Sequence, residues 1–355
     1  MQNPGKLFKA FILFLFTVVI VNPSLADDRN QLTNKKDHGH MVIANRASGT
    51  ISVIDIRTDL VSATVALPAA SNPAEPMYVV HTPRAKRVFV GDRANNRVAV
   101  FDDITFVYET SVPVGNGVFH MWADLSDAQL WVNNDIDNTA TVIDPVTLEI
   151  LATVPMPQDL VALGGKPHDV ILDPVGRSAF VTIVGITGVN DYVVKFDTDD
   201  FMETARAAVG KDAHVSLTPR NKLLYVPTQN SNAVYVLTRK DLSLVKILDI
   251  PGAHGAGMTR SGKTFYTTNI SSGGVAGLFT IDTKQNVIIG NGVDTPFATP
   301  HNIALTPRDN KLYVTHSGAS ADQVSVYLID KKSRLPVLET TITVGLNPFG
   351  IAFVR

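Results

Sequence analysis

The stretch that decides the fold is Pro300-His301-Asn302-Ile303-Ala304-Leu305-Thr306-Pro307-Arg308-Asp309-Asn310-Lys311-Leu312-Tyr313-Val314, two short apolar runs joined by a tight polar turn. Variants of this pattern recur along the chain, running from Pro76-Met77 to Val88-Phe89-Val90, from Phe119-His120 to Leu130-Trp131-Val132, from Pro167-His168 to Ala179-Phe180-Val181, from Ala213-His214 to Leu224-Tyr225-Val226, and from Ala253-His254 to Phe265-Tyr266. A period of roughly 40–50 residues, repeated about seven times, is typical of a β-propeller or another repeat array.

The two ends of the chain complement each other. Near the N-terminus, Met41–Asn45, Thr50–Asp55 and Ser62–Leu67 read as three strands without the leading strand of the other repeats. Near the C-terminus, Phe349–Val354 reads as a leading strand without the three that follow it. We therefore predict an all-β, seven-bladed β-propeller, in which a blade shared between the N- and C-terminal strands closes the ring and removes open sheet edges.

Composition excludes several classes of function. The chain has 355 residues, 45% of them apolar and 18% charged, with a formal net charge of -2, so no nucleic-acid partner is expected. It contains no cysteine, which excludes disulfides, thiolate metal ligands and a cysteine nucleophile. Any metal ion must therefore be held by His, Asp, Glu, Met or backbone oxygen.

The first residues form a segment of their own. Lys6 and Lys9 precede an apolar run over residues 10–21, followed by Pro23-Ser24-Leu25-Ala26. This pattern predicts a secretory signal peptide over residues 1–26, then a flexible leader over 27–39 and the propeller over 40–355. The alternative is an uncleaved anchor, but the apolar run is shorter than the ~20 residues that spanning requires. We expect a periplasmic monomer with no membrane span after cleavage.

Histidines gather at one structural position of the repeat. In a propeller the first strand of each blade lines the central channel, so the starts of these strands share one rim. Aligned on the strand of Leu-Tyr-Val type, the rim positions are Met77, Phe119, His168, Ala213, His254, His301 and Phe349. His120 and His214 fall one residue later, which in a regular strand points them to the other face. A β-bulge or an irregular strand start would bring them back.

Five of the nine histidines thus lie at or beside the rim. Neutral imidazole is the commonest metal ligand and suits copper, zinc or iron. We predict a metal site with His168, His254 and His301 as core ligands, completed by His120 and His214. Because neighbouring blades are closest, a single ion would favour His214, His254 and His301, whereas a cluster could use all five. Candidate supporting residues around this site are His316, Asp169, Met77 and Met121.

The repeat, with Leu-Tyr-Val, a Ser/Asn-rich turn and then a Val-x-Val-Ile-Asp strand, resembles the YVTN-type β-propeller family over residues 41–355. The Pro167-His168-Asp169 and Pro300-His301-Asn302 segments are also similar to blade starts in the propellers of nitrous oxide reductase and thiocyanate dehydrogenase. That resemblance implies an exported oxidoreductase with copper as its metal. Met77 and Phe349 depart from the pattern, and no cysteine-rich copper domain is present.

Two other functions remain open at this point. The histidine ring could be structural, or could serve a non-catalytic binding module for a periplasmic protein or small ligand. A lactonase or lyase on the same fold would use histidine for acid–base chemistry instead. The small-molecule substrate and the redox partner are not encoded in any motif of the sequence.

Cleavage after Ala26 is expected to give a mature chain that begins at Asp27 and is released with periplasmic contents. Intact-mass measurement of protein expressed from the full sequence checks this. Retention of residues 1–26 by a membrane-bound chain would contradict it.

Overall fold

The computed structural model describes residue 1 and residues 38–188, 190–219 and 222–355. The predicted signal peptide and most of the predicted leader, residues 2–37, lie outside the described residues. The described residues from 38 to the C-terminus belong to one compact unit. Within the described part of the chain, no helix is long and apolar enough to cross a membrane.

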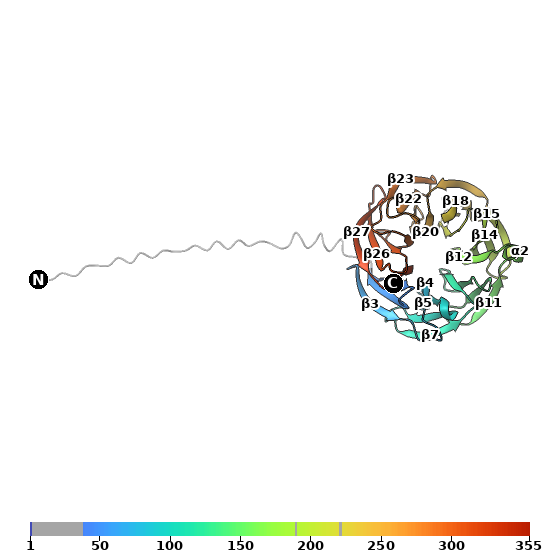
Figure 1. Ribbon diagram of the computed structural model, residues 1–355, viewed down its shortest axis with the longest axis horizontal. Helices are drawn as coiled ribbons and strands as arrows, with labels where there is room; N and C mark the ends of the chain where they lie inside the picture. Colours follow the sequence, from blue (N-terminus) through green and yellow to red (C-terminus); the bar gives the residue numbers. More distant parts are fainter. Residues whose placement is uncertain (2–37, 189, 220–221) are drawn as a thin grey trace. The chain divides into compact units, whose positions relative to one another are not determined.

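Seven antiparallel sheets of four strands each make up this unit, which confirms the predicted seven-bladed propeller (Figure 1). The innermost strand of each blade lies near the centre of the ring. These strands are β28 (Pro348–Val354), β4 (Pro76–Thr82), β8 (Val118–Ala123), β12 (Lys166–Leu172), β16 (Ser216–Leu217), β20 (Ala253–Met258) and β24 (Pro300–Leu305). The second strands are β1 (His40–Asn45), β5 (Arg87–Asp92), β9 (Leu130–Asn134), β13 (Ser178–Val184), β17 (Leu223–Thr228), β21 (Thr264–Asn269) and β25 (Lys311–His316).

The outer half of each blade is equally regular. The third strands are β2 (Thr50–Asp55), β6 (Arg97–Asp102), β10 (Thr139–Ile143), β14 (Asp191–Asp197), β18 (Ala233–Thr238), β22 (Leu278–Asp282) and β26 (Gln323–Ile329). The outermost strands are β3 (Leu60–Ala66), β7 (Tyr108–Pro113), β11 (Ile150–Pro155), β15 (Glu203–Val209), β19 (Leu244–Asp249), β23 (Val287–Val293) and β27 (Pro336–Thr343). Helical segments among the described residues are short: η2 (Arg93–Asn95), α2 (Gln158–Ala162) and η3 (Gln229–Ser231).

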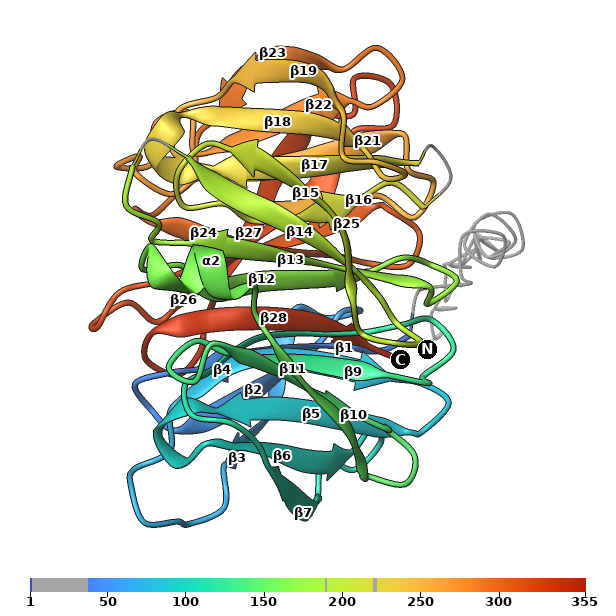
Figure 2. The same cartoon turned by 90° about the vertical axis from the view of Figure 1, so that its right-hand side faces the viewer.

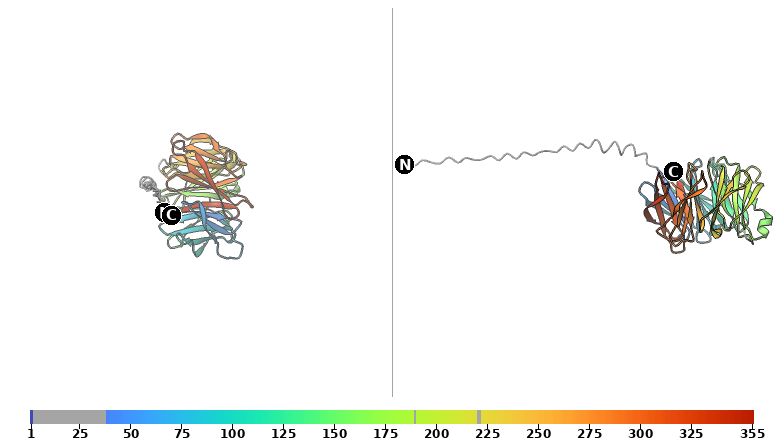
Figure 3. Two further views of the ribbon diagram at one scale, coloured as in Figure 1. Left: turned by 90° about the vertical axis from the view of Figure 1, so that its left-hand side faces the viewer. Right: turned by 90° about the horizontal axis from the view of Figure 1, so that it is seen from above.

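Ring closure follows the predicted sharing of one blade by both chain ends. β28 pairs with β1 in antiparallel register, with Met41 opposite Phe353 and Val42 opposite Ala352. β28 also contacts β4 on one side and β24 on the other, so it joins the first and last complete blades. Seen edge-on, the innermost strands cross the thickness of the ring roughly along its axis (Figures 2 and 3).

The hydrophobic core lies between the faces of neighbouring blades. The second and third strands are buried along most of their length, and their β-branched and aromatic residues suit a sheet packed on both faces. One cluster, for example, combines Val42 and Val53 of the closing blade with Val88 and Ala99 of the next. The outermost strands alternate between exposed and half-buried residues, as in β3. Each blade therefore depends on both of its neighbours.

Deleting residues 349–355 is expected to prevent stable folding. It removes all of β28 except Pro348, so apolar side chains on both neighbours are exposed at a cost of roughly 1.5–3 kcal/mol each, against a typical stability of ~5–15 kcal/mol. Limited proteolysis and thermal melting check this, with removal of Arg355 alone as the control. Parent-like melting of the longer deletion would contradict shared-blade closure.

Candidate metal centre

A β-bulge at the start of the innermost strand decides which side chains face the channel. In six blades the register between the innermost and second strands shifts so that two residues are left without a direct partner. The bulged residues are Met77–Tyr78, Phe119–His120, His168–Asp169, His254–Gly255, His301–Asn302 and Phe349–Gly350. A bulge re-aims side chains locally, as the rim position of His120 requires.

Polar residues of the second strand hold these bulges in place. The hydroxyl of Thr268 accepts a hydrogen bond from the Gly255 amide at 2.8 Å and donates one to the His301 carbonyl of the next blade at 3.0 Å. Likewise, the Thr315 hydroxyl accepts a hydrogen bond from the Asn302 amide at 3.1 Å and donates one to the Phe349 carbonyl at 2.9 Å. Each such hydroxyl therefore satisfies a bulged amide and ties one blade to the next.

The blade of His214 is built differently. β16 has only two residues, and its start is held by an isolated bridge between Ala213 and Thr228. The residue equivalent to Thr268 is Pro227, which has no hydroxyl, and its carbonyl accepts the His214 amide at 2.8 Å. This irregular start places His214 against His168, with ring centroids 4.5 Å apart.

The five rim histidines form a chain of contacting rings. Neighbouring centroids are 5.1 Å apart for His120–His168, 3.9 Å for His214–His254 and 4.8 Å for His254–His301. His120 also lies 5.3 Å from His214. The side chain of His168 is half-buried, and those of the other four are buried.

Aromatic side chains complete this chain of rings. Tyr78 packs on His120 with centroids 3.7 Å apart, and Phe349 lies 4.2 Å from His301. Met77, the residue predicted at this rim position, is instead fully buried in the core beside Phe89. Tyr78, the second residue of the same bulge, contacts the rim rings in its place.

Three of the histidines come closest to a metal-binding arrangement. His120, His168 and His214 can each offer a ring nitrogen such that these atoms lie within 4.8 Å of one another. The sequence favoured His214, His254 and His301 for a single ion, and the structure groups the residues differently. A tetrahedral ion with bonds of about 2.0–2.1 Å needs nitrogens roughly 3.4 Å apart, so small side-chain rotations would complete the site.

Oxygen atoms orient these three imidazoles. Asp169 Oδ1 lies 2.8 Å from His120 Nδ1, and Asp169 Oδ2 lies 3.5 Å from His214 Nδ1. The carbonyl of Ala213 accepts a hydrogen bond from His168 Nδ1 at 3.3 Å. A proton on Nδ1 leaves the Nε2 lone pair available, which is how metal-bound histidines are commonly held. Among the described residues, the buried Nε2 atoms of His120 and His214 have no hydrogen-bond partner.

The other two rim histidines differ in their hydrogen bonds. Neither ring nitrogen of His254, both of them buried, has a partner in the described part of the chain. His254 contacts the His214 ring but is not one of the three histidines whose ligand atoms converge. The Asn302 amide donates to His301 Nδ1 at 3.0 Å and to the Phe349 carbonyl at 3.1 Å. Because His301 Nδ1 accepts, its Nε2 carries the proton in the neutral ring and is a hydrogen-bond donor.

The candidate supporting residues separate into two kinds. Asp169 contacts two of the histidines and the Val215 amide, at 3.0 Å, so it is placed to support the site. His316 uses both ring nitrogens elsewhere, with the Ala298 carbonyl at 3.1 Å and the Ser325 hydroxyl at 2.8 Å. Met121 packs in the core with Met77. The assignment of any of these residues as ligands remains a prediction.

Burial favours the neutral form of four rim imidazoles, whereas contact with histidines keeps the Asp169 carboxylate charged. Desolvation lowers the pKa of His168, His254 and His301 well below the usual value, and neighbouring imidazoles add to the shift. Desolvation also lowers the pKa of His120, although Asp169 opposes it. Burial alone would raise the pKa of Asp169, but contact with His120 and His214 holds it well below its usual range.

A cavity of about 630 Å³ occupies the channel on one side of the rings. At the end nearest the histidines, its lining consists of residues that lie just past the bulges, such as Val79, Ile171, Ile303 and Ile351. At the opposite end, the lining includes charged residues. Most of the wall near the histidines is aliphatic. None of the five rim histidines lines this cavity, which lies beside the histidine cluster and can hold a small, weakly charged molecule.

The role of the second-strand threonines in holding the bulges was not predicted from the sequence. A signal for them exists, since Thr182, Thr268 and Thr315 each stand directly after the Leu-Tyr-Val-like segment that marks the second strand. Asn133 has the same place in its blade and donates to the His168 carbonyl at 3.1 Å.

Comparisons with known proteins show the fold alone. No protein-family model matches the chain, and no curated protein sequence matches it. Among solved structures, a putative 6-phosphogluconolactonase from Bacteroides uniformis aligns with a TM-score of 0.69 and 18% identity, over 90% of this chain and 100% of the other. Hydrazine synthase of Kuenenia stuttgartiensis aligns with a TM-score of 0.66 and 15% identity, over 81% and 97%. A periplasmic gluconolactonase of Pseudomonas aeruginosa aligns with a TM-score of 0.67 and 15% identity, over 89% of this chain and 99% of the other.

Acid is expected to destabilise the metal-free protein through the buried histidines. Burial lowers the pKa of His120, His168, His254 and His301, so their contribution to stability is present above the unfolded value of about 6.5. It is lost as the pH falls toward the folded values, by up to about 1.4 kcal/mol per pH unit for each of these histidines. His301→Phe should reduce this slope, because phenylalanine occupies the equivalent rim position in two other blades. Urea unfolding at a series of pH values checks this. An unchanged slope, equal to that of the exposed-site control His38→Gln, would contradict it.

Proposed function

We propose that this protein is an exported metal-binding propeller that acts as an oxidoreductase on a small molecule, with copper as the favoured metal. The observation that carries the proposal is the group His120, His168 and His214. Each imidazole has an oxygen at its Nδ1, and the buried Nε2 atoms of His120 and His214 lack a hydrogen-bond partner within the described residues. A buried polar atom without a partner costs free energy, and a bound cation would remove that cost.

The donor set favours copper among the common metals. All-imidazole sites suit copper, zinc, iron and nickel, and copper(II) binds such ligands more tightly than the other divalent first-row ions. When bound, copper supplies one-electron redox chemistry, which the side chains of this chain cannot supply. With His254 beside His214, the histidine chain also extends beyond the first three ligands, so more than one ion is compatible with it.

The chain's own residues have definite tasks in this proposal. Asp169 fixes the ring orientation of His120 and His214 and offsets the charge of a bound cation. The aliphatic wall of the cavity excludes bulk water and can hold a small substrate beside the rings. His301, with its proton on Nε2, supplies a hydrogen-bond donor among the rim histidines.

Metal binding is expected to require His120, His168 and His214. The chelated and reloaded parent should retain copper, His214→Ala should lose it, and Asp169→Asn should bind about 10–100-fold more weakly because the ring orientation is lost. Elemental mass spectrometry and competition titration measure this.

His316→Gln is the matched control, since both ring nitrogens of His316 are already hydrogen-bonded and the copper content should not change. Equal, negligible copper in the parent and all variants would contradict the proposal. The histidine ring would then be a structural feature or an organic-ligand site of a binding module.

A second candidate function rests on the His120–Asp169 contact. A histidine whose Nδ1 proton is held by a buried carboxylate can act as a general base through Nε2, as a lactone hydrolase requires. Two of the aligned structures carry lactonase names, at 18% and 15% identity. Lactone hydrolysis that survives chelation and disappears in His120→Gln would favour this function over the metal centre.

A further inference from the structure

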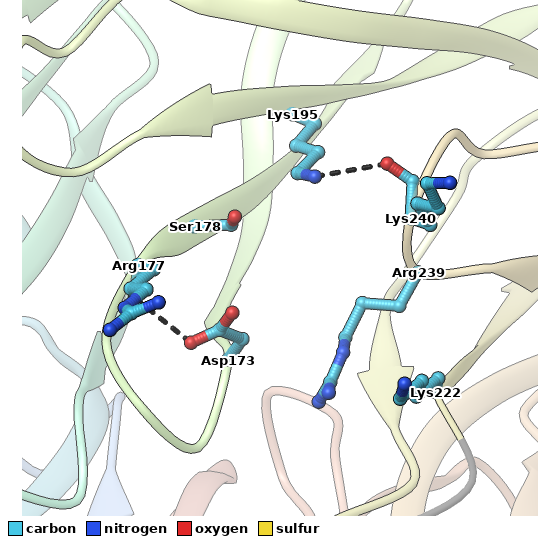
Figure 4. Close-up of a pocket in the computed structure, with 7 residues that line it drawn as sticks. All are labelled: Asp173, Arg177, Ser178, Lys195, Lys222, Arg239 and Lys240. Carbon is cyan, nitrogen blue, oxygen red and sulfur yellow. Dashed lines mark hydrogen bonds between the residues drawn. The ribbon is translucent and has the colours of Figure 1, made fainter.

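A second cavity, of about 480 Å³, shares no lining residue with the histidine cluster and lies between the blade of β12–β15 and the blade of β16–β19. It is open on one side of the ring, at turns that connect strands. Its lining consists of Asp173, Arg177, Ser178, Lys195, Lys222, Arg239 and Lys240 (Figure 4). Five of these seven residues are cationic and one is acidic, whereas the whole chain has a net charge of -2. The concentration of positive charge is therefore local to this cavity.

The cationic groups are only partly used by the protein itself. Lys195 Nζ donates to the Lys240 carbonyl at 3.0 Å, which leaves two of the three ammonium protons for other acceptors. Arg239 is half-buried, and its Nη1 atom is buried without a hydrogen-bond partner among the described residues. A guanidinium stays charged at any ordinary pH. Loss of a proton therefore cannot remove the free-energy cost of burying this donor without a hydrogen-bond partner.

The single carboxylate does not neutralise the cavity. Asp173 is buried, and its Oδ1 accepts the backbone amides of Val175 and Arg177 at 3.1 and 2.9 Å. It therefore stabilises the turn between β12 and β13. Figure 4 shows Arg239 extending from its turn into the space between Lys222 and Asp173, with Lys195 and Arg177 on other sides of the opening.

We propose that this cavity binds a phosphate or sulfate group, either as the free ion or as the ester group of a small organic molecule. Tetrahedral oxyanions accept bidentate hydrogen bonds from arginine and point-charge contacts from lysine, and both donors are available here. The Ser178 hydroxyl in the lining adds a neutral donor. The limited volume suits one such group with a small organic substituent, whereas a nucleic-acid backbone needs an extended basic surface. Because the two sites have no residue in common, this one does not depend on the proposed metal function.

Calorimetric titration of the full mature protein with inorganic phosphate, sulfate and phenyl phosphate tests this, with chloride at matched ionic strength as the reference. Saturable binding of the oxyanions is expected. The double variant Lys195→Gln/Arg239→Gln should weaken it by about tenfold or more, because hydrogen bonds to charged groups are lost. The control pair Lys246→Gln/Lys331→Gln removes the same charge from exposed positions outside the cavity and should retain parent affinity.

Comparison of the anions identifies the source of the ligand. Equal affinity for phosphate and phenyl phosphate indicates a site for the free ion, and tighter binding of the ester indicates an organic ligand. Arg239→Lys, which keeps the charge but not the planar guanidinium, should fall between the parent and the double variant, and it provides a second measurement if the double variant does not fold. Absence of saturable binding in the parent, or equal loss in both charge-matched pairs, would overturn the proposal. Binding that persists in His214→Ala would separate this site from the metal centre.

Discussion

The pairing of β28 with β1 is the constraint on which the other features depend. It turns seven sheets, each of which covers only its neighbours, into a closed ring in which every blade face is packed. Only a closed ring brings the starts of seven innermost strands together around one axis. The histidines of β8, β12, β20 and β24 are far apart in the sequence, yet their rings belong to one chain of contacts because closure fixes the positions of their strands.

Within that ring, hydrogen bonds between blades set the fine geometry. Thr268 and Thr315 each bond a bulged amide in their own blade and a carbonyl in the next, and that carbonyl belongs to a rim residue. The rim side chains are therefore fixed at the backbone, by neighbours on both sides, before any contact between imidazoles is made. Buried aromatic packing, such as Tyr78 on His120, then restricts the rings themselves. Backbone hydrogen bonds and aromatic packing thus position the site before any ligand binds.

The repeat made the fold predictable from the sequence, including the shared blade, because each Leu-Tyr-Val-like strand marks the same place in every copy. The histidines could be located to the rim for the same reason. Which of two adjacent residues faces the channel could not be predicted, as Met77 and Tyr78 illustrate, because a bulge depends on a partner in another strand. The pairing of Asp169 with His120 and His214 was equally hidden, since it joins three blades. The basic cavity likewise combines residues of two blades that form no sequence motif.

Pro227 gives the site a property that exact repetition could not provide. Seven identical blades would surround the axis with seven equivalent positions. A ligand off the axis would bind equally well at each of them. In the blade of β16–β19, proline replaces the threonine or asparagine of its neighbours, the bulge is absent, and His214 approaches Asp169 of the preceding blade. The departure breaks the rotational symmetry at one point of the ring. The proposed metal centre is therefore located where the repetition fails.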